Sequence, residues 1–170
     1  LIPFGDVTIL RMDLYHQYGP RFAEFYDRVT QMKSFLYSWN TGLGGSFLGN
    51  FYNYLCSPLS IVMLIFGHKN MPEAIATMIL LAAAFSSATF CYYLKKSFGE
   101  HSLITAAFGV LYSFCGFFID YYWNLMWLDA MVLFPLMILG IERIINERRP
   151  ALYIFSLSMT LLTSYYMGYM

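Results

Sequence analysis

The segment Asp13–Pro20 is a polar cluster in a chain that is otherwise mostly apolar. Asp13 and His16 lie three residues apart, so a helical turn would place both on one face. A carboxylate beside a histidine can accept a proton from a hydroxyl group, which is general-base chemistry. The alternative is that Asp13 caps a helix N-terminus, with Pro20 near the start of the next helix. Gln17 orients a substrate in the first interpretation and bonds the backbone in the second.

A second group of polar and aromatic residues, 120–129, lies between two apolar runs. Carboxylates at the ends of membrane helices are costly unless they face water or a partner. Tryptophan and asparagine together suit a sugar, because the ring stacks on its apolar face and the amide bonds its hydroxyls. The alternative is an aromatic belt at the membrane surface, with Asp129 capping the next helix. We predict binding roles for Trp123, Asn124, Trp127 and Asp129, and a belt role for Tyr121 and Tyr122.

The elements that must position these residues are strongly apolar. Hydrophobic residues make up 59% of the 170 positions and charged residues 12%, whereas a soluble domain carries about 25% charged residues. The mean hydropathy is +0.54. Long apolar runs separated by short basic loops argue against a soluble all-α protein with a large core. We therefore predict an all-α, polytopic integral membrane protein, and the zero net charge gives no indication of a nucleic-acid partner.

Within residues 73–170, apolar runs predict four transmembrane helices. Pro72 and Glu73 are favoured at the N-terminus of the first. The loops at Lys95–Lys96 and Glu142–Arg149 hold five of the ten Lys and Arg residues, which predicts that they are cytoplasmic and that 120–129 is extracellular. The predicted helices span residues 74–94, 102–119, 130–145 and 151–170.

Residues 55–72 contain a short apolar segment, Pro58–Phe66, which would cross only about half of a bilayer. If it spanned the membrane, the basic loops would face outside. We therefore predict a re-entrant or interfacial hairpin here, which leaves residues 1–54 extracellular. An amphipathic helix from Pro20 to Lys33 is expected to lie at the membrane surface, and the glycines at 42, 44, 45 and 49 are expected to break any regular element. Because the chain starts without Met and stops inside an apolar stretch, we expect a fragment of a longer protein.

Several stretches resemble the bacterial YfhO family, whose members are much longer. They are Gly5–Asp6, Asp13–Tyr18, Tyr37–Gly44, Ser57–Leu59, Tyr122–Asp129 and Ser164–Met170. YfhO proteins resemble the GT-C superfamily of membrane glycosyltransferases, which implies a GT-C-like fold. The resemblance implies transfer of a sugar, with inversion, from a polyprenyl-phosphate donor to an envelope polymer such as lipoteichoic acid, outside the bacterial cytoplasmic membrane.

The resemblance also implies roles for particular residues. GT-C enzymes keep an essential acidic residue in the first extracellular loop; Asp13 matches it, and Asp6 is the second candidate. Trp39 and Asn40, in a matching stretch, join His16 and Gln17 as substrate-binding candidates. The leaving lipid phosphate would be stabilised by a cation, for which the candidates are Arg11, His68 and Lys69, although His68 and Lys69 also fit a solvated turn. Some GT-C enzymes need a divalent metal and others do not; without an Asp-x-Asp motif here, we predict no metal and no other cofactor.

Two other functions stay open. A transporter or flippase for lipid-linked envelope precursors would explain polar residues near the spans and a re-entrant hairpin. However, the middles of the four predicted spans lack Asp, Glu, Lys and Arg. A non-enzymatic envelope assembly protein would leave Asp13 replaceable without loss of activity.

Overall fold

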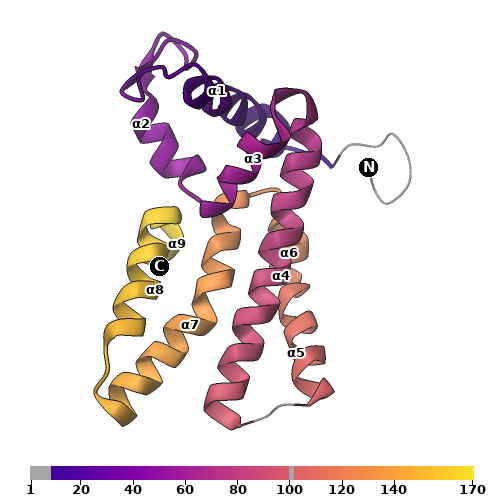
Figure 1. Ribbon diagram of the computed structural model, residues 1–170, viewed down its shortest axis with the longest axis vertical. Helices are drawn as coiled ribbons and strands as arrows, with labels where there is room; N and C mark the ends of the chain where they lie inside the picture. Colours follow the sequence, from indigo (N-terminus) through magenta and orange to yellow (C-terminus); the bar gives the residue numbers. More distant parts are fainter. Residues whose placement is uncertain (1–8, 100–101) are drawn as a thin grey trace.

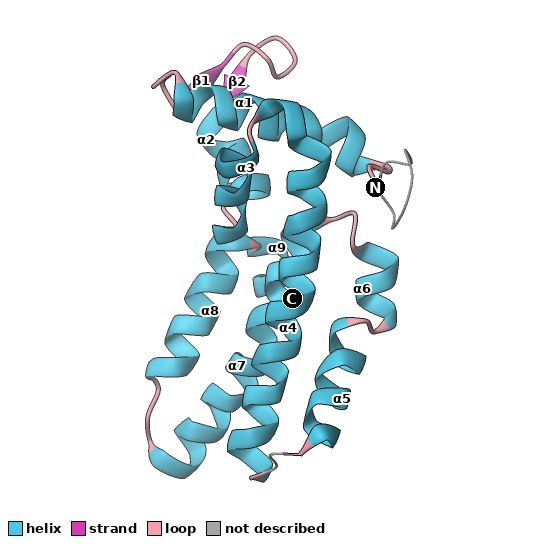
Figure 2. Cartoon of the chain, turned by 45° about the vertical axis from the view of Figure 1, so that its right-hand side comes forward, coloured by secondary structure: helices cyan, strands magenta, loops and turns pink. Residues whose placement is uncertain are grey.

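The computed structural model describes residues 9–99 and 102–170, which are almost entirely helical (Figure 1). One layer holds the long helices α4 (Met71–Phe98) and α7 (Leu125–Glu147) together with α5 (Leu103–Ser113), α6 (Gly116–Tyr121), α8 (Ala151–Thr163) and α9 (Tyr165–Tyr169). The other layer lies across one end of them and holds α1 (Gly19–Thr30), α2 (Phe47–Asn50) and α3 (Ile61–Phe66). Two strands, β1 (Tyr37–Ser38) and β2 (Gly45–Ser46), pair antiparallel at the outer edge of this layer (Figure 2).

The long helices are apolar enough to cross a membrane. Three helical segments of the described chain have the length and composition of spans: His68–Phe98, Leu103–Tyr121 and Leu125–Glu147. They keep many large apolar side chains exposed, including Leu80, Phe108 and Phe134, which suits contact with lipid tails. This is the predicted all-α polytopic membrane protein.

The two layers define two ends of the molecule. The chain leaves α4 and α7 at one end, where the basic loops lie, while α1, α2 and α3 lie at the other end (Figure 1). The short connection between α6 and α7 also reaches the end occupied by α1–α3. This arrangement agrees with a shared side for residues 9–66 and the loop before α7.

The predicted loop 120–129 is mostly helical. α6 continues to Tyr121 and α7 starts at Leu125, so only residues 122–124 connect them. Asp129 therefore lies in the second turn of α7 and does not cap it, and Asn124 occupies the N-cap position. The prediction of a start at residue 130 was wrong because hydropathy alone ignores the burial of Leu125 and Leu128 in the core.

The predicted fourth span, 151–170, is not one helix. α8 ends at Thr163, and Ser164 adopts φ −153° and ψ 74°, which turns the chain into α9. A Cβ on Gly168 would lie 3.0 Å from Leu161 Cδ2, so glycine lets α9 fold closely against α8. The 13 residues of α8 extend about 20 Å at 1.5 Å per residue, less than the thickness of a bilayer core. The predicted span 102–119 is likewise interrupted, between α5 and α6.

A bent pair of helices, called the hairpin below, overlaps the predicted hairpin at residues 55–72 and begins earlier in the chain. Helical residues Phe47–Leu55 and Pro58–Phe66 meet at an angle of 104°, and the turn between them points toward the long helices (Figure 1). Ser57 starts the second arm, since its hydroxyl accepts a hydrogen bond from the Leu59 N–H and Pro58 occupies the first helical turn. Gly49 lies inside α2 and does not break it.

The amphipathic helix is present as α1, shorter than the predicted Pro20–Lys33. It buries Phe22 and Phe25 against the hairpin and the first turns of α4. A π-helical segment, Leu14–Tyr18, precedes it, and a second one, Phe51–Leu55, forms the first arm of the hairpin with α2. π-helical turns are uncommon and often occur at functional sites.

Candidate functional site

A polar groove of about 500 Å³ runs beside the start of α1. Its walls come from the π-helical segment Leu14–Tyr18, from α1, and from the loop that follows β1. The structure thus brings Asn40 to the same groove as His16 and Gln17, so three predicted substrate-binding residues share it. The other polar side chains along the groove are those of Arg21, Glu24, Asp27 and Thr41.

Asp13 does not line this groove but is hydrogen-bonded to Gln17, which does. Its side chain is half-buried, and its Oδ1 accepts a hydrogen bond of 2.8 Å from Gln17 Nε2. It forms no side-chain capping bond, so the capping interpretation does not describe its contacts. His16 does not pair with Asp13 in the described structure, and its ring is in a T-shaped arrangement with the Tyr15 ring, with the centroids 5.2 Å apart.

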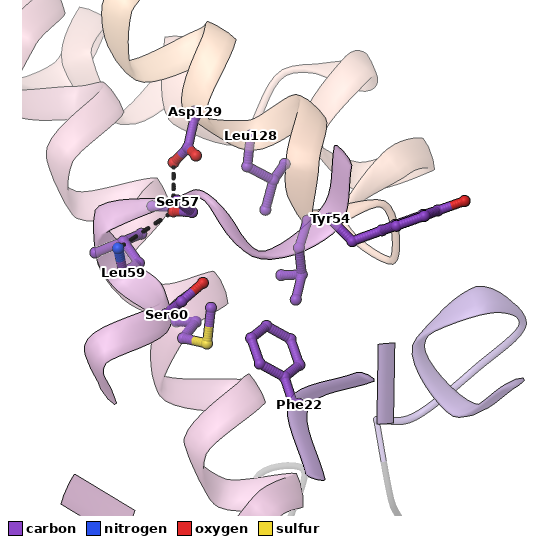
Figure 3. A pocket seen from close by; sticks show the side chains of 10 residues that line it. Phe22, Tyr54, Ser57, Leu59, Ser60, Leu128 and Asp129 are labelled. Atoms are coloured by element: carbon purple, nitrogen blue, oxygen red, sulfur yellow. Dashed lines mark hydrogen bonds between the residues drawn. The ribbon is translucent and has the colours of Figure 1, made fainter. Parts of the chain in front are cut away.

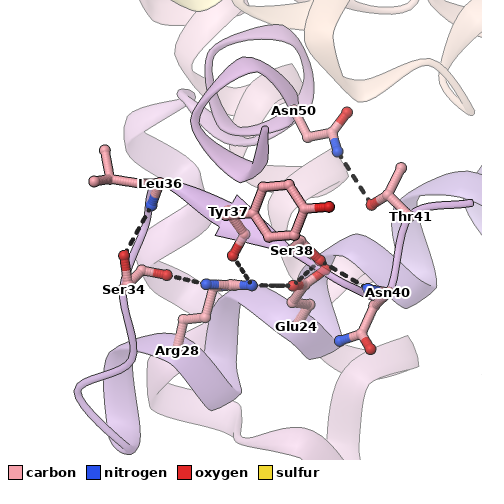
Figure 4. A network of polar contacts seen from close by, with 9 residues as sticks. All are labelled: Glu24, Arg28, Ser34, Leu36, Tyr37, Ser38, Asn40, Thr41 and Asn50. Carbon is pink, nitrogen blue, oxygen red and sulfur yellow. Dashed lines mark hydrogen bonds and ion pairs between the residues drawn. The ribbon is translucent and has the colours of Figure 1, made fainter. Parts of the chain in front are cut away.

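A buried ion pair holds the outer wall of the groove (Figure 4). Arg28 Nη2 and Nε bond Glu24 Oε1 at 2.6 and 2.9 Å, and Nη2 also donates to the Tyr37 carbonyl at 2.9 Å. Arg28 Nη1 donates to the Ser34 carbonyl, and the Ser38 hydroxyl donates to Glu24 Oε1 at 2.5 Å. Because these bonds fix β1 against α1, they position the following loop, which carries Asn40.

Tyr18 connects the groove region to the long helices. Its hydroxyl donates to Asn124 Oδ1 at 2.7 Å and accepts from the Met126 N–H at 3.2 Å. Burial raises the pKa of Tyr18 above its usual value, so the hydroxyl stays protonated and can donate. Asn124 is itself buried, so its amide serves a contact between two layers and does not line the groove.

The other candidates from residues 120–129 are dispersed. Trp123 is half-buried and donates from Nε1 to the Asp120 carbonyl at 2.7 Å. Trp127 faces a separate, largely apolar cavity of about 550 Å³ and stacks on Phe117 and Tyr166. Neither tryptophan lines the polar groove.

Asp129 lies on α7 at the turn of the hairpin (Figure 3). It is only 6% exposed, and its Oδ1 accepts a hydrogen bond of 3.0 Å from the Ser57 hydroxyl. Its Oδ2 is buried without a partner among the described residues, and so is the Ser60 hydroxyl, which lines the same small pocket. A buried carboxylate with an unused oxygen is energetically costly. The hairpin turn and α7 are therefore joined by a hydrogen bond that only partly satisfies Asp129.

The predicted phosphate-binding cations lie elsewhere. Arg11, His68 and Lys69 are exposed, and the rings of His68 and Tyr26 are in a T-shaped arrangement with their centroids 6.4 Å apart. None of the three lines the groove, whereas Arg21 does. Trp39 is 77% exposed and packs against the Tyr37 ring, with the ring centroids 5.0 Å apart.

Asp6 lies outside the described residues. Within the described ranges, no group of three His, Cys, Asp or Glu side chains is arranged to hold a metal ion.

Sequence reasoning missed four residues of this region: Tyr18, Arg21, Arg28 and Ser57. Tyr18 continues the helical spacing of buried positions Leu14, Phe22 and Phe25, which was a usable signal. Ser57 before Pro58 is a typical helix start. The pairing of Arg28 with Ser34 and Tyr37 has no comparable signal, because it depends on a return of the chain.

Comparison with known proteins settles the family. A family model described as bacterial membrane protein YfhO matches residues 1–170. This chain belongs to the YfhO family. A relative described as uncharacterized protein YfhO, from Bacillus subtilis (strain 168), is 31% identical over 155 residues. The match covers 80% of this chain and 17% of that relative, so the chain spans well under a quarter of its length. No solved structure matches this chain.

Proposed function

We propose that this YfhO chain is part of a membrane glycosyltransferase. The enzyme would move a sugar from a polyprenyl-phosphate donor to an envelope acceptor, such as lipoteichoic acid, on the outer face of the bacterial cytoplasmic membrane. The observation that carries the proposal is the polar groove whose lining residue Gln17 is hydrogen-bonded to Asp13, located at the end of the spans opposite to the basic loops. Such a location would let a lipid-linked sugar present its head group while its tail stays in the bilayer.

In the proposed reaction, the Asp13 carboxylate accepts the proton of an acceptor hydroxyl. The hydroxyl oxygen forms a bond to the anomeric carbon while the bond from that carbon to the phosphate oxygen breaks, which inverts the anomeric centre. The lipid phosphate leaves with the electron pair and needs no strong general acid. Gln17, which donates to Asp13 at 2.8 Å, holds the carboxylate in place. His16 and Asn40 supply hydrogen bonds for sugar hydroxyls.

The test is Asp13→Asn in the full-length protein, with glycosylation of the envelope polymer read by mass spectrometry. Asparagine keeps the size of the side chain and its carbonyl oxygen can still accept from Gln17, but it cannot act as a base. General-base catalysis contributes about 10²- to 10⁴-fold, so sugar transfer should fall by at least about 10²-fold. Asp120→Asn is the matched control, because Asp120 is exposed and does not line the groove. Normal glycosylation by Asp13→Asn at an unchanged protein level would refute the assigned role.

A transporter or flippase for lipid-linked precursors is the second candidate. The hairpin bent by 104° and the buried Asp129 on α7 favour it, because transporters place discontinuous helices and buried carboxylates near their substrates. Translocation of a lipid-linked sugar in proteoliposomes, continuing at full rate with Asp13→Asn, would support this candidate over the enzyme.

A further inference from the structure

Arg21 is an unused cation in the wall of the polar groove. It lies in the first turn of α1, is half-buried, and lines the groove. Its Nε is buried without an acceptor, and it forms no ion pair in the part of the chain that the structure describes. Glu24, the nearby carboxylate on the same helix, is already engaged by Arg28 and Ser38. A half-buried guanidinium that no carboxylate neutralises favours an anionic ligand in the groove that it lines.

The guanidinium is also held in one orientation. Its central carbon lies 3.9 Å from the centroid of the Tyr54 ring, so one face of its plane is stacked on an aromatic ring. Tyr54 in turn packs its ring edge-to-face with Tyr18 at 5.6 Å, and Tyr18 is hydrogen-bonded to Asn124. Stacking on Tyr54 occupies a face of the guanidinium plane and does not use its N–H groups. An arginine held in this way loses little side-chain entropy when it binds a ligand.

We propose that Arg21 binds the phosphate group of a ligand that occupies this groove. The planar fork of an arginine matches the geometry of phosphate oxygens and forms charge-assisted hydrogen bonds with them. The identification of that ligand as the lipid-linked sugar donor rests on the proposed function, whereas the phosphate site does not. Arg21 then takes the role that the sequence had assigned to Arg11, His68 or Lys69.

The rest of the groove suits a sugar next to that phosphate. Gln17, Asn40 and Thr41 supply amide and hydroxyl groups for sugar hydroxyls. Asp27, the other carboxylate of the lining, is six residues beyond Arg21, which is about 9 Å along a helix axis. The groove thus has a cation for the phosphate at one position. At other positions it has neutral hydrogen-bonding groups and a carboxylate, which can bond the hydroxyls of a sugar.

The first experiment measures phosphate binding to the full-length protein in a neutral maltoside detergent. Titration calorimetry with decyl phosphate should show binding by the wild type that Arg21→Gln weakens by at least about tenfold, the effect of losing a charged hydrogen bond. Arg21→Lys should bind with intermediate affinity, because lysine keeps the charge but loses the fork and the stacking. Lys69→Gln is the matched control and should bind like the wild type. Equal affinity of Arg21→Gln and the wild type for decyl phosphate would overturn the proposal.

A second experiment needs no substitution and so does not depend on variant folding. Phenylglyoxal modifies accessible arginines, and mass spectrometry reports the extent at each one. Decyl phosphate should protect Arg21 and leave Arg149 unprotected, since the Arg149 side chain is 78% exposed. Modification of Arg21 to the same extent with and without decyl phosphate would contradict the site.

Repeating the protection experiment with inorganic phosphate shows whether the site binds free phosphate or a phosphate carried on a lipid chain. Protection of Arg21 by both compounds would assign the site to phosphate itself. Protection by decyl phosphate alone would assign it to a phosphate carried on a lipid chain, and either result supports the site. The proposed function is tested separately. If it holds, Asp13→Asn should lower sugar transfer and leave decyl phosphate binding unchanged. If glycosylation survives in Asp13→Asn while Arg21→Gln loses binding, the phosphate site stands and the assigned catalytic role does not.

Discussion

The hydroxyl of Tyr18 is the contact whose removal tests the architecture most directly. Tyr18→Phe deletes one oxygen that donates to Asn124 Oδ1 at 2.7 Å and accepts from the Met126 N–H at 3.2 Å. The ring stays, with its contacts to Phe22 and Tyr54. Asn124 is buried, so the substitution leaves a buried acceptor and a backbone donor unsatisfied at the start of α7.

Each buried group left without a partner costs about 1–3 kcal/mol. Partial relaxation makes a total of about 2–3 kcal/mol reasonable for the two groups. Such a loss should raise hydrogen exchange through local opening by about 30- to 140-fold. The increase should appear together at residues 14–18 and 124–128, although more than a hundred residues separate the bonded pair.

Hydrogen exchange read by mass spectrometry on the full-length protein in detergent is the assay. Tyr15→Phe is the matched control, because Tyr15 lies in the same π-helical segment and is 63% exposed. It should change exchange by less than about twofold, as surface substitutions change stability by under about 0.5 kcal/mol. Unchanged exchange at residues 124–128 in Tyr18→Phe, or an equal change in Tyr15→Phe, would refute the reasoning.

Two further predictions concern thermal unfolding of the full-length protein in detergent. Ser57→Ala removes the hydrogen bond that the Asp129 side chain accepts, as well as a helix cap, and should cost about 1–3 kcal/mol. Ser57→Thr keeps the hydroxyl and should retain most of the stability. An unchanged melting temperature in Ser57→Ala would contradict the contact. Gly140→Ala should lower the melting temperature, because its Cβ would lie 2.7 Å from the backbone of Tyr153 on α8 and overpacking costs about 1–3 kcal/mol. Gly116→Ala meets nothing within 4 Å and should be neutral or slightly stabilising, so equal effects of the two alanines would refute the close approach of α7 and α8.

The sequence predicted the features that depend on local composition. Apolar runs identified the membrane class, and Pro72 and Glu73 marked the start of the first long helix, where the structure places both in its first turn. The apolar spacing of Phe22 and Phe25 predicted α1. The count of basic residues in two loops predicted a hairpin at residues 55–72, and a pair of helices bent by 104°, Phe47–Leu55 and Pro58–Phe66, overlaps this range. These signals depend on residues close together in the sequence, and they can be detected without knowing which residues contact one another in the fold.

Only the tertiary structure decided which polar residues share a site. His16, Gln17 and Asn40 come together beside α1, whereas Asn124 is hydrogen-bonded to Tyr18 and Asp129 to Ser57. Residue type and spacing suggested that the tryptophans and Asn124 act together, but α7 starts early and directs them to different surroundings.

The dependence on tertiary contacts also explains why the sequence did not single out Arg21. Its sequence neighbours mark it as the polar face of an amphipathic helix, and nothing near it in the chain sets it apart from Arg28. Arg28 meets Glu24 and two carbonyls of the returning strand segment, while Arg21 meets the face of Tyr54 and open groove. The sequence determined that this chain is a helical membrane protein with a more polar segment before its spans. The packing of that layer decided which charges are neutralised and which remain free to bind, because that depends on contacts between residues distant in the chain.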